Sequence, residues 1–249
     1  MADWIKAYSR RRAGQPDANL AHAWKILYED IYTRSSDVRD STIIASRPCL
    51  TGYASRFTDP EIHYDNKDLL KVWQLMLQTQ KTDRDTYLHD LVSVASQTMS
   101  NYALGVRNAM ATAYRAKNEQ AFEQKATEFL DLIKDVDKIL VTRPERLLGI
   151  WIADAKSFGK DESQHQYYTH NARNILTTWG RKGSRLTDYG NRLWAGLVGD
   201  YYYSRWKLFI SELRKTIQNE KEFDAAGFED RISEFEWQWT LSNKSYPLE

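Results

Sequence analysis

This 249-residue sequence has one cysteine, a net charge close to zero and no long apolar run, and each of these features excludes a class of site or partner. The single cysteine, Cys49, excludes an internal disulfide and a cysteine-built structural zinc site. Lys and Arg number 35 against 34 Asp and Glu, so no basic excess points to nucleic acid or to an anionic membrane as a partner. No run of 18 apolar residues is present, and the sequence therefore encodes no membrane span.

Prolines are also few, and their placement favours long helices. They stand at positions 16, 48, 60, 144 and 247, which leaves residues 61–143 without any. Proline breaks a helix interior, so such a stretch suits helices well. Hairpin turns such as Asn-Gly between alternating apolar runs are absent, and strand signals are weak. We therefore predict an all-α protein of about nine helices, forming one domain over residues 1–249.

Apolar residues recur at helical spacing along most of the chain, as Leu20, Trp24, Leu27 and Ile31 do. The expected helices cover residues 3–12, 17–33, 68–79, 85–117, 119–139, about 144–159, 161–179, 188 to about 218, and 224–243. Residues 34–65 show no sustained period and are predicted to form a long irregular connection, a kind of segment that often carries function.

Helix starts are marked by acidic and proline residues. Asp161 is placed to cap one helix, and Asp188 is placed to cap the long helix that follows the break in periodicity. Near Pro144 two starts are possible. Either Thr142 and Glu145 form a capping box, or residue 143 is the cap and Pro144 occupies the first helical turn.

No catalytic or metal-binding constellation is recognisable. The five histidines include no HExxH pair, phosphate-binding glycine motifs are absent, and Ser184 lies outside any GxSxG elbow. His165 with Glu162 or His170 could meet a metal, but polar surface roles explain these residues better. Asp188 is better explained as a helix cap than as one member of a catalytic pair of carboxylates. We predict no catalytic residue, no metal site and no cofactor in this chain.

Aromatic residues are densest over His165–Phe209, where three Trp and six Tyr fall within 45 residues. Helical periodicity breaks once there, over Gly180–Thr187. Seven tryptophans lie within helical stripes and are predicted to be core: Trp24, Trp73, Trp151, Trp194, Trp206, Trp237 and Trp239. A short loop can leave aromatic faces open to a partner, so Trp179 and Tyr189, which flank the break, are candidates for contact with a sugar or another protein.

Several motifs occur at intervals over nearly the whole chain. They are AWKILYEDIY at 23–32, SRPCL at 46–50, the element of Tyr64, Asn66, Leu69 and Trp73, and LLGIWIADA followed by Tyr168, Asn171, Ala172, Arg173, Thr177, Trp179 and Gly180. Together they resemble the C-terminal all-helical domain of the α-N-acetylglucosaminidases of glycoside hydrolase family 89. The chain departs from the family pattern at Thr169, where Glu is frequent, and at Ala13, where Tyr is usual.

The resemblance implies that residues 1–249 are the helical domain of a longer enzyme. In that family a small domain and a (β/α)8 barrel with two catalytic glutamates come first, so both would precede Met1. The enzymes release terminal α-linked N-acetylglucosamine with retention of configuration, and the helical domain packs on the barrel and adds residues to the sugar pocket. Matched motif by motif, these residues are Trp179, Leu186 and Tyr189. The implied compartment is secreted, periplasmic or lysosomal.

Three functions follow from the sequence. The leading one is a hydrolase module that is inert alone, with the catalytic barrel of its own parent chain and a glycan ending in α-N-acetylglucosamine as partners. The alternative is a free-standing helical scaffold for protein interactions that shares only ancestry with the enzymes. The third, an autonomous carbohydrate-binding module, requires sugar affinity in the isolated chain.

Overall fold

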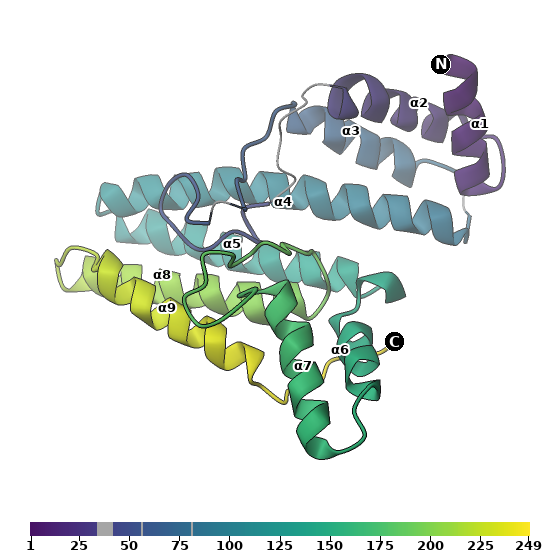
Figure 1. The fold of residues 1–249 in the computed structure, drawn as a ribbon. Helices are drawn as coiled ribbons and strands as arrows, with labels where there is room; N and C mark the ends of the chain where they lie inside the picture. Colours follow the sequence, from purple (N-terminus) through teal and green to yellow (C-terminus); the bar gives the residue numbers. More distant parts are fainter. Residues whose placement is uncertain (34–41, 56, 81) are drawn as a thin grey trace. The chain divides into compact units, whose positions relative to one another are not determined.

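A computed structural model describes residues 1–33, 42–55, 57–80 and 82–249, and the regular elements of these residues are helices. Part of the predicted irregular connection, residues 34–41 and 56, lies outside the described residues. Nine α-helices are present in the described part: α1 (Ala2–Ala13), α2 (Ala18–Ile26), α3 (Asn66–Leu77), α4 (Asp85–Arg115), α5 (Glu119–Leu140), α6 (Leu148–Ser157), α7 (Glu162–Leu176), α8 (Tyr203–Gln218) and α9 (Ala225–Thr240) (Figure 1). The prediction of an all-α fold is confirmed.

Three shorter helical turns complete the described elements. Two have π-helical geometry, η1 (Leu27–Tyr32) and η3 (Leu197–Tyr202), and η2 (Pro144–Arg146) is a 3-10 turn. Each π-helical turn is continuous with an α-helix, η1 after α2 and η3 before α8. None of the described helices is both long enough and apolar enough to cross a membrane.

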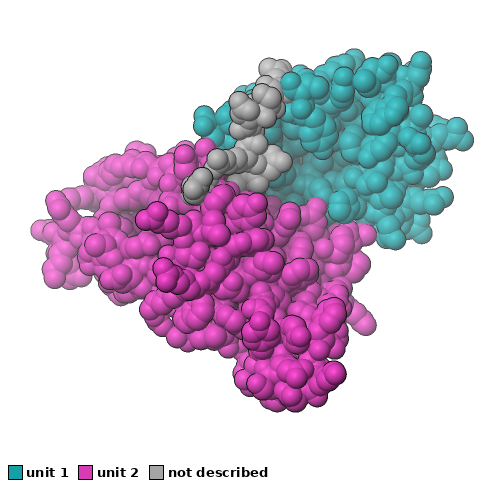
Figure 2. Space-filling view, viewed as in Figure 1, with its two compact units in different colours: residues 1–38, 61–102 teal, residues 39–60, 103–249 magenta. Residues whose placement is uncertain are grey.

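The chain divides into two compact units, shown in different colours in Figure 2. Unit 1 comprises Met1–Val38 and Glu61–Tyr102, and unit 2 comprises Arg39–Pro60 and Ala103–Glu249. The boundary between them falls within α4. Residues 179–189, which the sequence marks as functional, therefore belong wholly to unit 2.

Unit 1 encloses an apolar core made by the facing stripes of its helices. The stripes of α2 and α3 meet there, and Leu20, Val72 and Met76 are fully buried. Tyr87 of α4 joins this core, and its hydroxyl donates a hydrogen bond of 2.7 Å to the carbonyl of Met76. The buried phenol is thereby satisfied, so the core includes no unpaired polar group at this position.

Unit 2 is built on α5, which packs against η3 and α8, while α9 packs against α8 (Figure 1). Trp206 is the largest fully buried side chain; its ring meets Phe129 edge-on at 4.7 Å, and its Nε1 donates to the carbonyl of Ile44 at 3.2 Å. Separately, α6 and α7 form an antiparallel pair (Figure 1). The core prediction is right for Trp206 and for Trp239, which are both buried.

The core prediction is wrong for Trp151. Its side chain is 39% exposed on α6, its Nε1 donates to the carbonyl of Ala172 at 2.9 Å, and its ring lies 5.7 Å from that of Trp194. Trp194 is partly buried and lies outside any helix. A helical stripe identifies the face that meets a neighbour, but it does not give the depth of burial at a helix on the edge of the fold.

Helix starts follow the predicted chemistry at two places. The Asp161 side chain caps α7 by accepting a 2.9 Å hydrogen bond from the Gln164 N–H. At Pro144 the second alternative is right, because Arg143 is the cap and Pro144 occupies the first position of η2. The Glu145 carboxylate pairs with the Arg143 guanidinium at 3.0 Å. The α-helix proper, α6, begins only at Leu148.

The helix predicted to begin at Asp188 starts later, and Asp188 does not cap it. Regular structure resumes only at Leu197, with η3. The capping carboxylate comes from α5, where Asp137 Oδ1 accepts hydrogen bonds from the N–H groups of Gly196 and Gly199 at 2.8 and 2.7 Å. A cap supplied by a distant helix leaves no local sequence signal, which is why the nearest upstream aspartate was the wrong choice.

Candidate functional site

The segment between α7 and η3, residues 177–196, holds unusual backbone geometry. Non-glycine residues with positive φ occur at five described positions, and three of them lie here: Trp179 (48°), Asp188 (67°) and Asn191 (30°). Left-handed backbone is costly for residues that carry a Cβ and persists only where the surroundings impose it. We call residues 177–196 the connecting segment, and its hydrogen bonds to α7 and to other parts of unit 2 impose this conformation.

Hydrogen bonds from α7 fix the start of the connecting segment. The Trp179 N–H donates to the carbonyl of Asn174 at 2.7 Å. The Asn174 side-chain amide donates in turn to the Gly180 carbonyl at 2.6 Å and to the Thr178 hydroxyl at 2.7 Å. One asparagine therefore binds the backbone on both sides of Trp179 and sets the position of its ring.

A compact turn centred on Ser184 carries the chain from Trp179 to Tyr189. The Ser184 Oγ accepts from the Leu186 N–H at 3.1 Å, and the Ser184 carbonyl accepts from the Thr187 hydroxyl at 2.8 Å. The Tyr189 N–H then donates to the Leu186 carbonyl at 3.0 Å. Outside the segment, the Ser55 hydroxyl donates to the Thr187 carbonyl at 2.8 Å. The turn is thus held from within and from the 42–60 region of unit 2.

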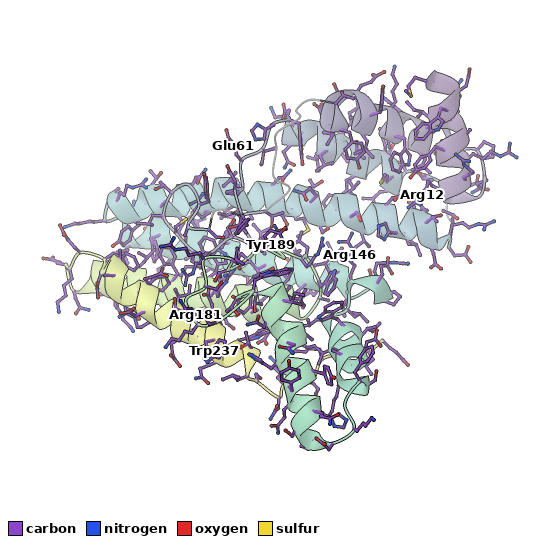
Figure 3. The ribbon with its side chains drawn as sticks, in the orientation of Figure 1. Arg12, Glu61, Arg146, Arg181, Tyr189 and Trp237 are labelled. Carbon is purple, nitrogen blue, oxygen red and sulfur yellow. The ribbon has the colours of Figure 1, made fainter. Side chains whose placement is uncertain are left out.

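The segment presents an aromatic pair to its surroundings. The rings of Trp179 and Tyr189 lie 4.8 Å apart at 57°, and Phe57 meets the Tyr189 ring edge-on at 5.0 Å. Tyr189, labelled in Figure 3, is nevertheless 51% exposed, and Leu186 is 41% exposed, while Trp179 is partly buried. The structure thus brings together the two predicted aromatic residues, with Leu186 on the turn between them.

Phe57 is a member of this cluster that the sequence did not identify. It lies in unit 2, within the predicted irregular connection, and its carbonyl accepts a 3.2 Å hydrogen bond from the Asn191 side chain. The only signal in the sequence was the length of this connection without a sustained period, because long connections often carry function. Tyr189 lies 132 positions further along the chain, so no local pattern links it to Phe57.

A buried ion network lies beneath the connecting segment and is centred on Arg205 of α8. Arg205 Nη1 donates to both carboxylate oxygens of Asp188, at 2.8 and 2.9 Å, and to Glu236 Oε1 of α9 at 3.0 Å. Its Nη2 donates to the Ala45 carbonyl at 2.8 Å. Its guanidinium carbon also lies 4.5 Å from the centre of the Tyr201 ring, a cation–π contact. Asp188 and Arg205 are fully buried.

Arg47 extends the network toward the surface. Its guanidinium donates to Glu236 Oε2 at 2.9 Å and to Glu229 Oε1 at 2.5 Å. The Arg47 side chain is largely buried, whereas that of Glu229 is exposed. Two guanidinium groups thus face two buried carboxylates, those of Asp188 and Glu236, so the interior charge is balanced as buried charges require.

Burial and the neighbouring charges of the network shift the pKa values of Asp188 and Arg205. Burial removes water from the Asp188 carboxylate and raises its pKa to about 6, with Arg205 opposing the rise and the like charge of Glu236 adding to it. Burial also opposes the charge of Arg205, but the Asp188 carboxylate outweighs this and holds the Arg205 pKa above its usual value. Both oxygens of Asp188 face Arg205, so this acid is not presented to an external substrate.

A polar cavity of about 340 Å³ opens beside the turn. It is lined by Arg47, Ala54, Ser55, Gly183, Ser184, Arg185, Thr187 and Glu229. The lining thus combines the Ser184 turn with the outer end of the ion network. Trp179, Leu186 and Tyr189 are not among the lining residues.

The two histidines considered as metal ligands bind main-chain carbonyls. His165 Nε2 lies 3.2 Å from the Gly159 carbonyl, and His170 Nδ1 lies 3.2 Å from the Thr240 carbonyl. Within the described ranges, no group of three or more His, Cys, Asp or Glu side chains is placed to hold a metal ion. His165 therefore joins the first turn of α7 to the chain before it, and His170 joins the middle of α7 to the end of α9.

Similarity to known proteins covers the whole chain. A family model described as the alpha-N-acetylglucosaminidase (NAGLU) C-terminal domain matches residues 4–249. The chain belongs to this family. Human alpha-N-acetylglucosaminidase is 27% identical over 254 residues, a match that covers 99% of the chain and 33% of the human protein.

Solved structures from Clostridium perfringens extend this finding. A family 89 glycoside hydrolase, captured with its substrate GlcNAc-alpha-1,4-galactose, has a TM-score of 0.89 and 30% identity, and the match covers all of this chain and 29% of that one. The same hydrolase in complex with PUGNAc gives a TM-score of 0.88 at 30% identity. The chain is a C-terminal domain of a family 89 enzyme, and it spans about a third of the length of these relatives.

Proposed function

We propose that this domain packs on a (β/α)8 catalytic barrel of its parent chain and completes a pocket for terminal α-linked N-acetylglucosamine in a retaining hydrolase. Two observations support the proposal: the family match over residues 4–249, and relatives that are about three times longer than this chain. The Clostridium perfringens relative was captured with GlcNAc-alpha-1,4-galactose, which indicates the class of sugar linkage.

Trp179, Leu186 and Tyr189 are the residues that we assign to the pocket wall. The observation that carries this assignment is the Trp179–Tyr189 ring pair, which stays partly open to solvent although Trp179 and Asp188, the residue before Tyr189, are held at positive φ. Strain of this kind clusters at sites where a side chain must be held in one position. Aromatic faces stack well on the apolar face of a sugar ring, and the exposed Leu186 adds apolar surface beside them.

Hydrolysis itself would depend on groups outside this chain. Glycoside hydrolysis with retention needs two carboxyl groups about 5–5.5 Å apart on either side of the bond. The acid nearest the aromatic pair in sequence, Asp188, is fully buried and bound to Arg205 through both oxygens. The domain would therefore position the sugar and exclude water, while the barrel supplies the acid and the nucleophile.

We expect Trp179→Ala and Tyr189→Ala, each made in the complete parent enzyme, to lower kcat/KM on an aryl α-N-acetylglucosaminide. An aromatic contact is worth about 1 kcal/mol, and about 1.4 kcal/mol corresponds to a tenfold change in rate. Misplacement of the sugar would enlarge the loss beyond this contact alone. Activity is measured per folded molecule, with the melting temperature recorded in parallel.

Tyr167→Ala provides the matched control, because this tyrosine of α7 is 62% exposed and lies outside the connecting segment. It should leave kcat/KM unchanged. If all three variants keep the parent activity per folded molecule, the aromatic pair has no role in the pocket and the assignment fails.

A further inference from the structure

Asp188 and Tyr189 are neighbours in the chain but occupy opposite environments. The Asp188 side chain is fully buried, whereas half of the Tyr189 side chain is open to solvent. Adjacent α-carbons are separated by a fixed distance of about 3.8 Å, so the direction of one side chain constrains that of the next. Whatever holds Asp188 therefore constrains where the Tyr189 ring can lie.

Asp188 is held at both its backbone and its side chain. Its N–H donates to the Thr177 carbonyl at 2.7 Å, and both of its oxygens accept from Arg205 Nη1. Arg205 is itself fixed by Glu236 and by the Ala45 carbonyl. The anchor of the connecting segment is thus attached to α8, to α9 and to the chain around residue 45.

The backbone of Asp188 is left-handed, and its side-chain contacts stabilise this unusual conformation in addition to filling space. At φ 67° an aspartate is tolerated better than most residues, but the conformation still needs compensation. Apolar side chains of similar volume in place of both Asp188 and Arg205 would fill the same space with comparable stability, since a buried ion pair contributes little net stability over a hydrophobic replacement. A directional charge pair instead specifies one orientation of the segment.

We propose that the Asp188–Arg205 ion pair is a positioning device for the sugar pocket, which holds Tyr189 against Trp179. Asp188 acts here as a positioning residue, because its side chain is fully buried against Arg205. This inference rests on the proposed function, in which Tyr189 forms part of the pocket wall.

A double-mutant cycle in the complete enzyme tests the inference. The four proteins are the parent, Asp188→Asn, Tyr189→Ala and the variant that carries both changes. Asparagine keeps the size of the side chain and tolerates left-handed backbone, so the substitution removes mainly the charge. We expect Asp188→Asn to lower kcat/KM per folded molecule about tenfold or more, since a displacement of about 1 Å can cost a hundredfold.

The decisive measurement is the effect of Asp188→Asn on kcat/KM in the enzyme that already carries Tyr189→Ala. If Asp188 acts through Tyr189, its effect on kcat/KM should shrink there to less than about twofold, while its effect on the melting temperature persists. A purely structural role would leave the kinetic effect equal in both backgrounds. That equality would overturn the inference, and so would parent-like kinetics in Asp188→Asn.

Two further variants complete the test. Asp137→Asn is the matched control, because Asp137 is a partly buried carboxylate of unit 2 that binds the backbone at Gly196 and Gly199 instead of Arg205. It should lower the melting temperature with unchanged kcat/KM in both backgrounds. Where Asp188→Asn yields no folded enzyme, Arg205→Lys displaces the donor while keeping its charge, and the same cycle with Tyr189→Ala applies. If Tyr189→Ala alone has no kinetic effect, the proposed pocket role fails and this inference fails with it.

Discussion

The two units bury different kinds of side chain, although both are helical. Unit 1 is closed by aliphatic residues such as Leu20, Val72 and Met76, and the guanidinium of its principal ion pair, Arg12–Asp90, remains partly exposed. Unit 2 surrounds Asp188 and Arg205 completely. An apolar core is satisfied by shape and volume, whereas a buried charge is satisfied only by one arrangement of partners.

This difference coincides with where the backbone departs from regular helix. In unit 2 the buried charges lie under the connecting segment, which contains Trp179 and Asp188 with positive φ. In unit 1, no described non-glycine residue has positive φ. The charged interior is therefore associated with the strained segment that carries the aromatic pair, so unit 2 departs from regular helical packing at the place that we propose for the pocket.

The largest loss of stability is expected when the largest buried ring of unit 2 is removed. We expect Trp206→Ala to lower the free energy of unfolding by about 3–5 kcal/mol, because a fully buried ring and its hydrogen bond to Ile44 are both lost. Denaturant unfolding of the isolated chain measures the change. Trp151→Ala is the control and should cost clearly less, since its ring is 39% exposed. If the two variants lose equal free energy of unfolding, the depth of burial does not determine what each ring contributes to stability.

A second test uses the pH dependence of stability, because a buried charged group such as Asp188 titrates and an apolar core does not. The Asp188 pKa lies at about 6 in the folded chain against an ordinary value of 3.8, and Arg205, Glu236 and Arg47 are the charged groups of its network. Between these two values the folded chain binds a proton that the unfolded chain has lost. Stability contributed by this group should therefore rise as pH falls from about 6 to about 4.

A pKa of about 6 in the folded chain against 3.8 in the unfolded chain corresponds to an effect on the order of 3 kcal/mol. Urea unfolding of the parent chain and of Asp188→Asn, from pH 4 to pH 8, isolates it, since the asparagine cannot titrate. The parent should gain stability relative to the variant as pH falls through this range. A gain as pH rises would mean that Arg205 outweighs burial and lowers the Asp188 pKa.

Sequence patterns predicted the regular part of this fold because their causes are local. Apolar spacing and the Asp161 cap depend on residues within one or two turns, and α7 begins where they indicate. Asp188 shows where this reasoning ends. Its partner Arg205 lies 17 residues away, and Glu236, which also binds Arg205, lies 48 away, so no spacing rule could connect them, and a cap was the best local explanation.

The aromatic cluster of the candidate site was predicted from the sequence only in part. Trp179 and Tyr189 were marked by a visible break in periodicity, and the structure brings their rings together. Phe57, the third ring of the cluster, comes from a region without a pattern. The resemblance to a known family, and not periodicity, singled out Leu186.

The smallest expected effect concerns the left-handed residues of unit 2 that lie outside the connecting segment. Lys117 and Glu220 follow the ends of α4 and α8, and both have positive φ. After each of them, the N–H of the next residue donates a hydrogen bond of 3.0 Å to the carbonyl of the third-last residue of the helix. These bonds run from Asn118 to Ala113 and from Lys221 to Thr216. Helices commonly end in this way with glycine at the left-handed position.

Glycine should therefore stabilise the chain at these two positions. The left-handed conformation costs a residue with a Cβ about 1–2 kcal/mol, and the added freedom of glycine in the unfolded chain offsets about 0.5–1 kcal/mol of that. Lys117→Gly and Glu220→Gly should each raise the free energy of unfolding by about 0.5–1 kcal/mol, as measured by urea unfolding, with unchanged kcat/KM in the complete enzyme. Trp179→Gly relieves the same backbone strain but removes the ring, so it should lower kcat/KM. If it leaves kcat/KM unchanged, the strain at Trp179 is no more than an ordinary helix ending, and the distinction between the connecting segment and the rest of unit 2 disappears.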